Sequence, residues 1–343
     1  MIWLTWRQFR TQAAVVIGGL AVVAIVLALT GPHLVSIADG YLKVCRVDKD
    51  CGVTNNPVLT TDPRLEGALN VLVILLPALI GIFWGAPLIA RELETGTYRL
   101  SWTQSVTRTR WLAVKVGVVG LASVVVAALF SLMVTWWSSP IDRANLDQFG
   151  PTFGQRDLAP IGYTAFAFAV GVTAGVLIRR TLPAMAVTLV AFVAAREALT
   201  FGLRPHLLPP EHVVSAITSV NQIGFNLSPS GLQVVGTTPN LPNAWVISTD
   251  FVSASGQTPT AQFLKSACPK LLNAPPGGGP SGGGPPPAFR ECAAKIGARF
   301  HEVVTYQPAN RYWAFQGIET AIFIAVALLL VGLSFWWVRH RLS

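Results

Sequence analysis

Long runs of apolar residues divide the chain, and six of them are long enough to cross a membrane. A helix needs about 20 mainly apolar residues to span the roughly 30 Å of hydrocarbon in a bilayer. The segments that meet this requirement are Ala13–Thr30, Ala68–Ala90, Leu112–Trp137, Ile161–Ile178, Leu182–Leu203 and Gln316–Val338. Charged residues make up only 12% of the chain, about half the share of a typical soluble domain, and the mean hydropathy is +0.53. The pattern predicts an α-helical integral membrane protein with six transmembrane helices.

The basic residues indicate how the spans are oriented. We place both termini, the loop between the second and third spans and the turn between the fourth and fifth on one side. That side carries eleven Lys and Arg residues against two acids, so its balance of +9 equals the formal net charge of the whole chain. The basic residues are Arg7, Arg10, Arg91, Arg99, Arg108, Arg110, Lys115, Arg179, Arg180, Arg339 and Arg341, and the acids are Glu92 and Glu94. Because Lys and Arg in short loops mark the cytoplasmic side, we expect a multi-pass protein of the cell membrane with cytoplasmic termini.

The same topology accounts for the isoelectric point near 9.8. Such a value can indicate nucleic-acid binding, but here the excess charge lies where the positive-inside rule puts it. We therefore expect a lipid membrane, and no nucleic acid, as a partner.

All four cysteines fall in two loops on the opposite, outer side. Cys45 and Cys51 lie in the first outer loop, and Cys268 and Cys292 in the last. Thiols confined to an oxidising compartment favour disulfides. Of the three possible pairings we favour Cys45–Cys51 with Cys268–Cys292, because each bridge then closes within one loop. A zinc site is the alternative, but no histidine lies near either pair at ligand spacing, so we predict no metal.

Residues 1–12 mix tryptophan and phenylalanine with arginine. At helical spacing this composition fits an interfacial N-terminal helix that lies in the headgroup layer. The alternative is an aromatic and cationic flank of the first span.

The last outer loop, residues 204–315, is large enough for a small α/β extracellular domain between helices 5 and 6. The runs that predict strands are 245–249 and 302–306, and those that predict short helices are 259–272 and 288–298. Residues 274–287 consist almost entirely of Gly and Pro, which leaves few side chains to bury. This tract is predicted to be a disordered insertion, bracketed by Cys268 and Cys292.

The loop after the second span carries the most informative motif. It contains Glu92, then Gly96-Thr97 and Leu100, then Ser-Val-Thr-Arg at 105–108, and finally Lys115. This pattern resembles the coupling-helix region of ABC-2-type (type V) ABC transporter permeases. A cationic loop with an amphipathic turn, which any multi-pass protein can have, is the alternative.

The resemblance implies a short coupling helix at 96–104 that rests in a cleft of an ATPase subunit. Glu92 and Glu94 would end the preceding span, and Gly96 and Thr97 would separate it from the short helix. Leu100 and Trp102 would supply the apolar docking contacts.

Two further runs, residues 3–10 and 301–316, are similar to an actinobacterial group of these permeases with a large extracellular domain. The chain has no P-loop, no H-E-x-x-H and no G-x-S-x-G motif, so we expect neither an enzyme nor a cofactor on this chain. The resemblance implies a permease subunit, and we expect an exporter. ATP and Mg²⁺ would bind to two copies of a cytoplasmic ABC ATPase, and a second copy of the permease or a homologous permease would complete the assembly. A non-transporting membrane sensor that uses the extracellular domain and an ABC ATPase is the alternative.

Ionisable residues inside spans are candidates for function. Arg196, with Glu197 beside it, lies 16 residues beyond Arg180, about 24 Å along a helix, and Glu319 lies 20 residues before Arg339, about 30 Å. The two side chains therefore lie at similar depth near the outer surface. Either Arg196 and Glu319 form an intramembrane charge pair, or both extend to the headgroups.

Overall fold

The computed structural model describes residues 2–48, 57–58, 63–97, 107–145, 148–149, 153–217, 223–228, 231–236, 241–272 and 287–341. The chain folds into two compact units. The helical unit consists of Met1–Leu207 and Tyr312–Ser343, and the inserted unit is Leu208–Arg311.

In the described part of the helical unit, six helices are long and apolar enough to cross a membrane, which confirms the predicted fold class. They are α1 (Ile2–Asp48), α3 (Pro63–Ile80) with the π-helix η2 (Gly81–Gly85) and α4 (Ala86–Thr95), α6 (Arg108–Asn145), α7 (Ala159–Ile178), α8 (Thr181–Glu197) with the π-helix η4 (Ala198–Leu203), and α12 (Tyr312–His340). The 3-10 helices η3 (Phe153–Gln155) and η5 (Arg204–His206) also lie in this unit, and η7 (Ala309–Arg311), at the end of the inserted unit, directly precedes α12.

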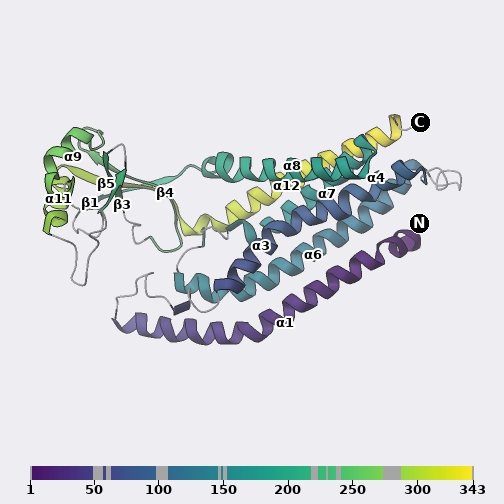
Figure 1. Ribbon diagram of the computed structural model, residues 1–343, viewed down its shortest axis with the longest axis horizontal. Helices are drawn as coiled ribbons and strands as arrows, with labels where there is room; N and C mark the ends of the chain where they lie inside the picture. Colours follow the sequence, from purple (N-terminus) through teal and green to yellow (C-terminus); the bar gives the residue numbers. More distant parts are fainter. Residues whose placement is uncertain are drawn as a thin grey trace. The chain divides into compact units, whose positions relative to one another are not determined.

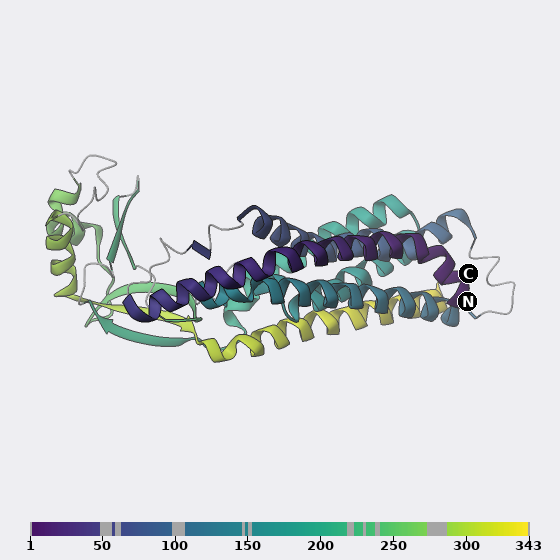
Figure 2. The same ribbon diagram turned by 90° about the horizontal axis from the view of Figure 1, so that it is seen from below.

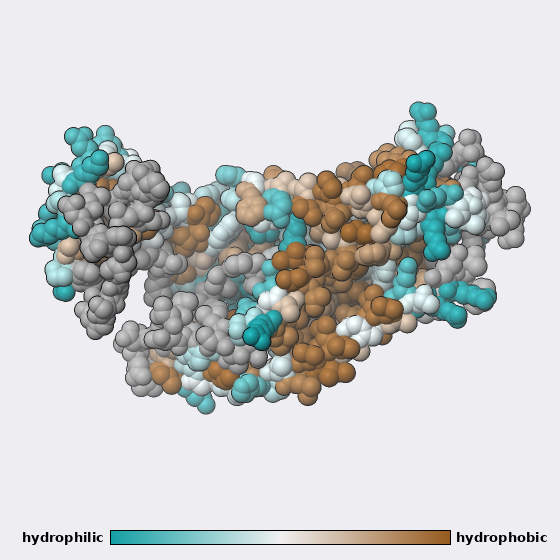
Figure 3. Space-filling model, viewed as in Figure 1, coloured by the Kyte–Doolittle hydropathy of each residue, from teal (hydrophilic) through white to brown (hydrophobic). Residues whose placement is uncertain are grey.

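The long helices lie side by side, and both chain termini are at the same end of the helical unit (Figures 1 and 2). We call this the terminal end; it also holds the end of α4, the start of α6 and the turn between α7 and α8. At the opposite, distal end, α7 and α12 begin. Hydrophobic side chains cover the middle of these helices, and hydrophilic ones gather at the terminal end (Figure 3).

Residues 2–12 do not form a separate element, because α1 is continuous from Ile2 to Asp48. The buried Phe9 packs edge-on against Trp84 of η2, with ring centroids 4.5 Å apart. This contact places Phe9 among the helices, so the structure favours a flank of the first span over a distinct interfacial helix.

The first span also continues past Thr30, its predicted end, through Gly31 and Pro32 to Asp48. Leu27, Leu34 and Ala38 recur on one face of α1, and all three are buried in a cluster with side chains of α6. The indole of Trp137 on α6 also donates a hydrogen bond to Thr30 Oγ1, at 2.9 Å. Packing against α6 therefore outweighs the local helix-breaking signal, and Cys45 lies on the helix.

Helix α7 is the centre of the helical unit and is buried along almost its whole length. Two Gly-x-x-x-Gly sequences meet there: Gly81 and Gly85 on η2, and Gly171 and Gly175 on α7. A Cβ atom on Gly171 would lie 2.4 Å from the Gly81 carbonyl oxygen, and one on Gly175 would lie 2.7 Å from that of Ala86. Small residues let helix backbones approach closely in a membrane, where packing replaces the hydrophobic effect as the main attraction between helices.

The inserted unit contains a three-stranded antiparallel sheet in the order β1-β5-β4 and a separate hairpin. The strands are β1 (Glu211–Ala216), β4 (Trp245–Ser253) and β5 (Phe300–Gln307), and the hairpin pairs β2 (Ile223–Ser228) with β3 (Gly231–Gly236). The described residues of this unit also form three short helices, α9 (Ala261–Ala267), α10 (Pro269–Leu272) and α11 (Pro287–Gly297). The predicted small α/β domain between helices 5 and 6 is therefore confirmed.

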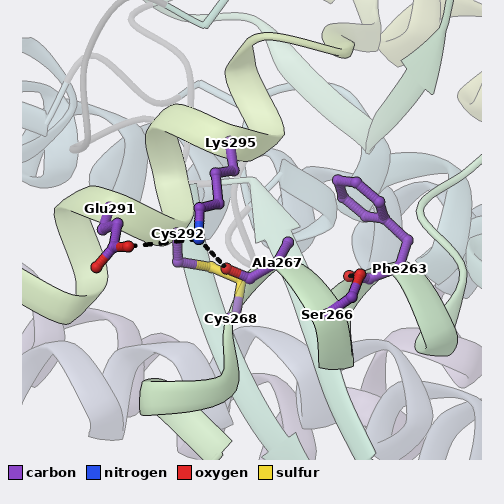
Figure 4. The surroundings of a disulfide bond; sticks show 7 residues. All are labelled: Phe263, Ser266, Ala267, Cys268, Glu291, Cys292 and Lys295. Atoms are coloured by element: carbon purple, nitrogen blue, oxygen red, sulfur yellow. Dashed lines mark hydrogen bonds and ion pairs between the residues drawn. A yellow bond between two sulfur atoms is a disulfide. The ribbon is translucent and has the colours of Figure 1, made fainter.

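The predicted Cys268–Cys292 disulfide is present and joins the end of α9 to α11 (Figure 4). Both cysteines are buried in one cluster with Leu264, Ile296 and other apolar side chains. Cys45 is also disulfide-bonded, but its predicted partner, Cys51, lies outside the described residues, as does nearly all of the 274–287 tract.

An exposed carboxylate next to the disulfide is held by two lysines. Lys270 donates to Glu291 Oε2 at 3.1 Å, and Lys295 forms an ion pair with Glu291 Oε1 at 3.4 Å. The hydrogen bonds from Lys270 and Lys295 keep the pKa of Glu291 below its usual range. Lys295 also donates to the Ala267 carbonyl at 3.2 Å, so it links α11 to α9 beside the bridge (Figure 4).

We predict that Gly171→Ala destabilises the helical unit by about 1–3 kcal/mol, because the added methyl group meets backbone atoms of η2. Thermal unfolding of the purified protein in detergent measures this change. Gly117→Ala on α6 is the matched control, because a Cβ atom there meets no heavy atom within 4 Å. Equal stability of the two variants would contradict the close contact of α7 with η2.

We predict that Cys268→Ser with Cys292→Ser destabilises the inserted unit by about 3 kcal/mol, because the bridge spans 24 residues and restricts the unfolded chain. Hydrogen exchange of the full-length protein should show less protection in α9, α11 and β5 while α7 is unchanged. Wild-type protein treated with a reductant should behave like the double variant. Unchanged protection of α9 and α11 would show that the apolar cluster suffices without the bridge.

Candidate functional site

A buried ion pair connects α4 to α6 at the terminal end. Glu92 Oε1 pairs with Lys115 Nζ, and the Lys115 side chain is only 7% exposed. The ammonium group also lies over the Trp111 ring, 5.2 Å from its centroid, where the electron-rich ring face attracts a cation. The two helices that flank the predicted coupling segment in the sequence are thus joined directly to each other.

A second carboxylate connects α4 to α8. Glu94 Oε2 accepts hydrogen bonds from the Thr181 backbone N–H at 2.9 Å and from Thr181 Oγ1 at 2.7 Å. Thr181 is the first residue of α8, so Glu94 satisfies an otherwise unpaired N–H group there and places negative charge near the positive end of the helix. The last turn of α4 is therefore bonded to both α6 and α8.

Gly96 ends α4 with a left-handed conformation, φ 72°, which suits glycine because it lacks a Cβ atom. Thr97 follows, with its hydroxyl 3.1 Å from that of Thr95. On the other side, Thr107 Oγ1 accepts from the Arg110 N–H at 3.3 Å, at the start of α6. Residues 98–106, which include Leu100 and Trp102, lie outside the described part of the chain.

The distal end contains a buried carboxylate with three polar bonds. Glu319 on α12 is fully buried. Arg204 of η5 donates from Nε to Oε2 at 2.9 Å and from Nη2 to Oε1 at 2.8 Å, a bidentate ion pair. Tyr163 on α7 donates its hydroxyl to Oε1 as well. One carboxylate thus joins α7, α12 and the end of the fifth span.

The predicted Arg196–Glu319 pair is wrong, because Arg204 occupies that position. The guanidinium of Arg196 lies over the Tyr163 ring, 5.1 Å from its centroid, and donates to the Ile74 carbonyl at 3.4 Å. Glu319 does not extend to the headgroups either, and Glu197 is exposed. Counting residues gives the height of a side chain along its helix but not the direction in which it points.

More polar side chains surround the start of α12. Gln316 accepts from the Ala159 N–H at 2.9 Å and donates to the Phe153 carbonyl at 2.8 Å, and Tyr312 donates its hydroxyl to Asp157. These bonds tie α12 to η3 and to the start of α7. Tyr312, Gln316 and Glu319 are spaced i, i+4, i+7 and therefore lie on one face of α12. A polar face at the start of an otherwise apolar span is the sequence pattern from which these residues could have been identified.

A separate ion pair lies near this polar face of α12. Arg156 forms a buried ion pair with Asp142 near the end of α6, and its Nη2 donates to the Gln148 carbonyl at 3.3 Å. The described residues contain no group of three metal-ligating side chains. The polar groups at the distal end bond helices to one another, and they form no recognisable nucleophile, base or metal site.

Comparison with known protein families places the chain. The family model described as ABC-2 membrane transporter related matches residues 17–204, more than half of the chain. The matched region begins within the first span and extends to the end of η4, and it includes Glu92, Glu94 and the segment between α4 and α6. Neither the curated proteins nor the solved structures give a match.

We predict that Glu319→Gln destabilises the protein by about 3–5 kcal/mol, because the Arg204 guanidinium, only 12% exposed, loses its counter-charge. Thermal unfolding in detergent checks this. The exposed Glu197→Gln on α8 is the matched control, with an expected change below about 0.5 kcal/mol.

The same measurement distinguishes the two arginines. Arg204→Gln should approach the effect of Glu319→Gln, whereas Arg196→Gln should cost about 1 kcal/mol, since it removes only a ring contact and a long hydrogen bond. A larger effect from Arg196 than from Arg204 would contradict the arrangement.

Proposed function

Because the chain belongs to the ABC-2 membrane transporter related family, we propose that it is the membrane-spanning permease subunit of an ATP-driven exporter. It is a permease-type membrane component, and its ATP hydrolysis takes place on a separate cytoplasmic ABC ATPase, which binds ATP and Mg²⁺. Two ATPase copies and a second permease, identical or homologous, complete the assembly. The distribution of charge supports cytoplasmic termini and an extracellular inserted unit.

The observation that carries this proposal is the anchoring of the segment between α4 and α6. Glu92 bonds the end of α4 to Lys115 on α6, and Glu94 bonds it to Thr181 on α8. A displacement of this segment by an ATPase would therefore act on three spans together. A connecting loop without such anchors would move by itself and would transmit little to the membrane.

A continuous set of contacts leads from this anchor to the distal end. Helix α4 packs on α7 through the close approach of Ala86 to Gly175, and α7 bonds to α12 through Tyr163 and Glu319. Packed helices with few alternative arrangements transmit a displacement, although contact alone does not measure the coupling energy. In this proposal, closure of the ATPases rearranges the spans along these contacts and opens a path for the cargo.

We predict that Trp102→Asp and Leu100→Asp abolish retention of the ATPase. Each places an unpaired charge in a desolvated contact, at a cost of several kcal/mol and thus more than 100-fold in affinity. Detergent pull-down of the tagged permease with its ATPase measures retention. The matched control is Trp313→Asp, because Trp313 is 61% exposed at the distal end. Wild-type retention by both loop variants would contradict the docking role of residues 96–104.

Reconstitution distinguishes export from the sensing alternative. Vesicles that contain the complex should show cargo flux together with stimulated ATP turnover. Turnover that responds to an external ligand without any flux would instead assign a sensing role to the inserted unit.

A further inference from the structure

The fifth span contains a π-helix between its two arginines, Arg196 and Arg204. In this element, η4, the Arg204 N–H donates to the Leu199 carbonyl oxygen, which lies five residues back instead of the usual four. A π-turn of this kind absorbs one extra residue within a helix. Such turns are rare and frequently occur at functional sites, so the extra residue in η4 is a candidate for a function.

The π-turn keeps the two arginines on one side of the span. Arg196 and Arg204 are eight residues apart, yet the first lies over the Tyr163 ring and the second donates to the Tyr163 hydroxyl at 3.3 Å. Eight residues of regular α-helix make two turns and about 80° more. In a regular helix Arg204 would therefore point away from Tyr163 and Glu319, and the wider turn of η4 brings it back to both.

A helix without the extra residue would place Arg204 equally well. Seven residues of α-helix make two turns less about 20°, so a span shortened by one residue would still present both arginines on one side. If Gly202 were removed, Leu199 would lie four residues before Arg204, and the bond between them would become an ordinary α-helical one. The extra residue is therefore dispensable for the arrangement in this structure, and it matters only if η4 also adopts another arrangement.

Packing does not hold η4 in its π-form. Leu199 is its only buried residue, and Phe201 and Leu203 are 76% and 55% exposed. A Cβ atom on Gly202 would meet no heavy atom within 4 Å. The other π-helix of the described residues, η2, differs in this respect, because its backbone is in close contact with α7. What holds η4 is the bidentate ion pair at its end, between Arg204 and Glu319.

We propose that η4 is a two-state latch between the fifth and sixth spans, an inference that rests on the permease function proposed above. In the closed state η4 is a π-helix and Arg204 holds Glu319. In the open state η4 rewinds as an α-helix, which turns Arg204 by about 80° away from Glu319 and releases the fifth span from α12 at the distal end. Release breaks an ion pair, so it is a step driven by ATP, and water that enters the opened path hydrates the carboxylate.

Deletion of Gly202 tests the closed state. The shortened protein should unfold in detergent at the wild-type temperature or above it, because Arg204 keeps its bonds to Glu319 and the π-turn becomes a regular helix. The matched control is deletion of Val190, an exposed residue of the regular part of α8. That deletion rotates the rest of the span by about 100° and should lower the unfolding temperature at least as much as Glu319→Gln. Equal loss of stability from the two deletions would overturn the proposal.

Hydrogen exchange of the full-length permease in complex with its ATPase tests the open state. Addition of Mg²⁺ and ATP should speed exchange of the amides from Leu199 to Arg204 in the wild type but not in the Gly202 deletion. The deletion variant should retain the ATPase in pull-downs and yet lose most of its ATP turnover. Gly202→Ala, which keeps the residue count, should behave like the wild type.

The outcomes separate the latch from the function on which it rests. Normal ATP turnover by the Gly202 deletion, or wild-type η4 amides that do not respond to ATP, would overturn the latch and leave the permease function standing. A wild-type chain that retains no ATPase would overturn the proposed function and the latch together.

Discussion

The backbone contact between η2–α4 and α7 is the constraint on which the helical unit depends. Lipid tails are as apolar as leucine, so helices in a bilayer associate through close packing and polar bonds rather than through the hydrophobic effect. Glycines on both sides allow that packing: Gly81 and Gly171 approach until a single methyl group would not fit. With α7 fixed in this way, its first turns carry Tyr163 to the distal cluster, and its last residue carries Arg179 to the terminal end.

At the distal end, a carboxylate is buried inside an apolar span. An ionised group there is costly unless it is paired and hydrogen-bonded. Glu319 meets this condition with a bidentate arginine and a tyrosine hydroxyl. Arg204 lies at the end of the fifth span, and Glu319 lies on the sixth. Their ion pair therefore holds together the two spans that precede and follow the inserted unit in the sequence. A bonded carboxylate of this kind favours one arrangement of three helices over others in which it would be left unpaired.

The sequence predicted those features that depend on the average character of a segment. The six spans follow from hydropathy, the α/β insertion from β-branched runs, and the Cys268–Cys292 bridge from the position of both cysteines in one loop that the charge pattern assigns to the oxidising side. Features that depend on a particular neighbour were not predictable in this way. Gly31-Pro32 suggests a helix end, but burial of Leu34 and Ala38 against α6 continues the helix. Arg196 and Glu319 lie at similar depth in the membrane, but the Glu319 carboxylate is paired with Arg204 instead. The two Gly-x-x-x-Gly sequences can be recognised in the chain, but the sequence alone does not indicate that they pack against each other.

The two ends of α7 differ in a way that bears on how the permease would move. At the distal end α7 bonds to the buried Glu319 carboxylate of α12 through the Tyr163 hydroxyl, so separating the two helices there leaves a buried charge with one hydrogen bond fewer. Toward the terminal end, Val176 of α7 and Val338 of α12 are buried in one cluster, and Thr173 bonds to Ser334 and to the Leu330 carbonyl. The last contact is a long hydrogen bond between the exposed residues Arg179 and Arg341. The neighbouring α4–α8 contact at Glu94 is likewise at the surface. The charged bonds to α12 are therefore confined to the distal end of α7, whereas apolar packing and neutral hydrogen bonds hold the helices together toward the terminal end.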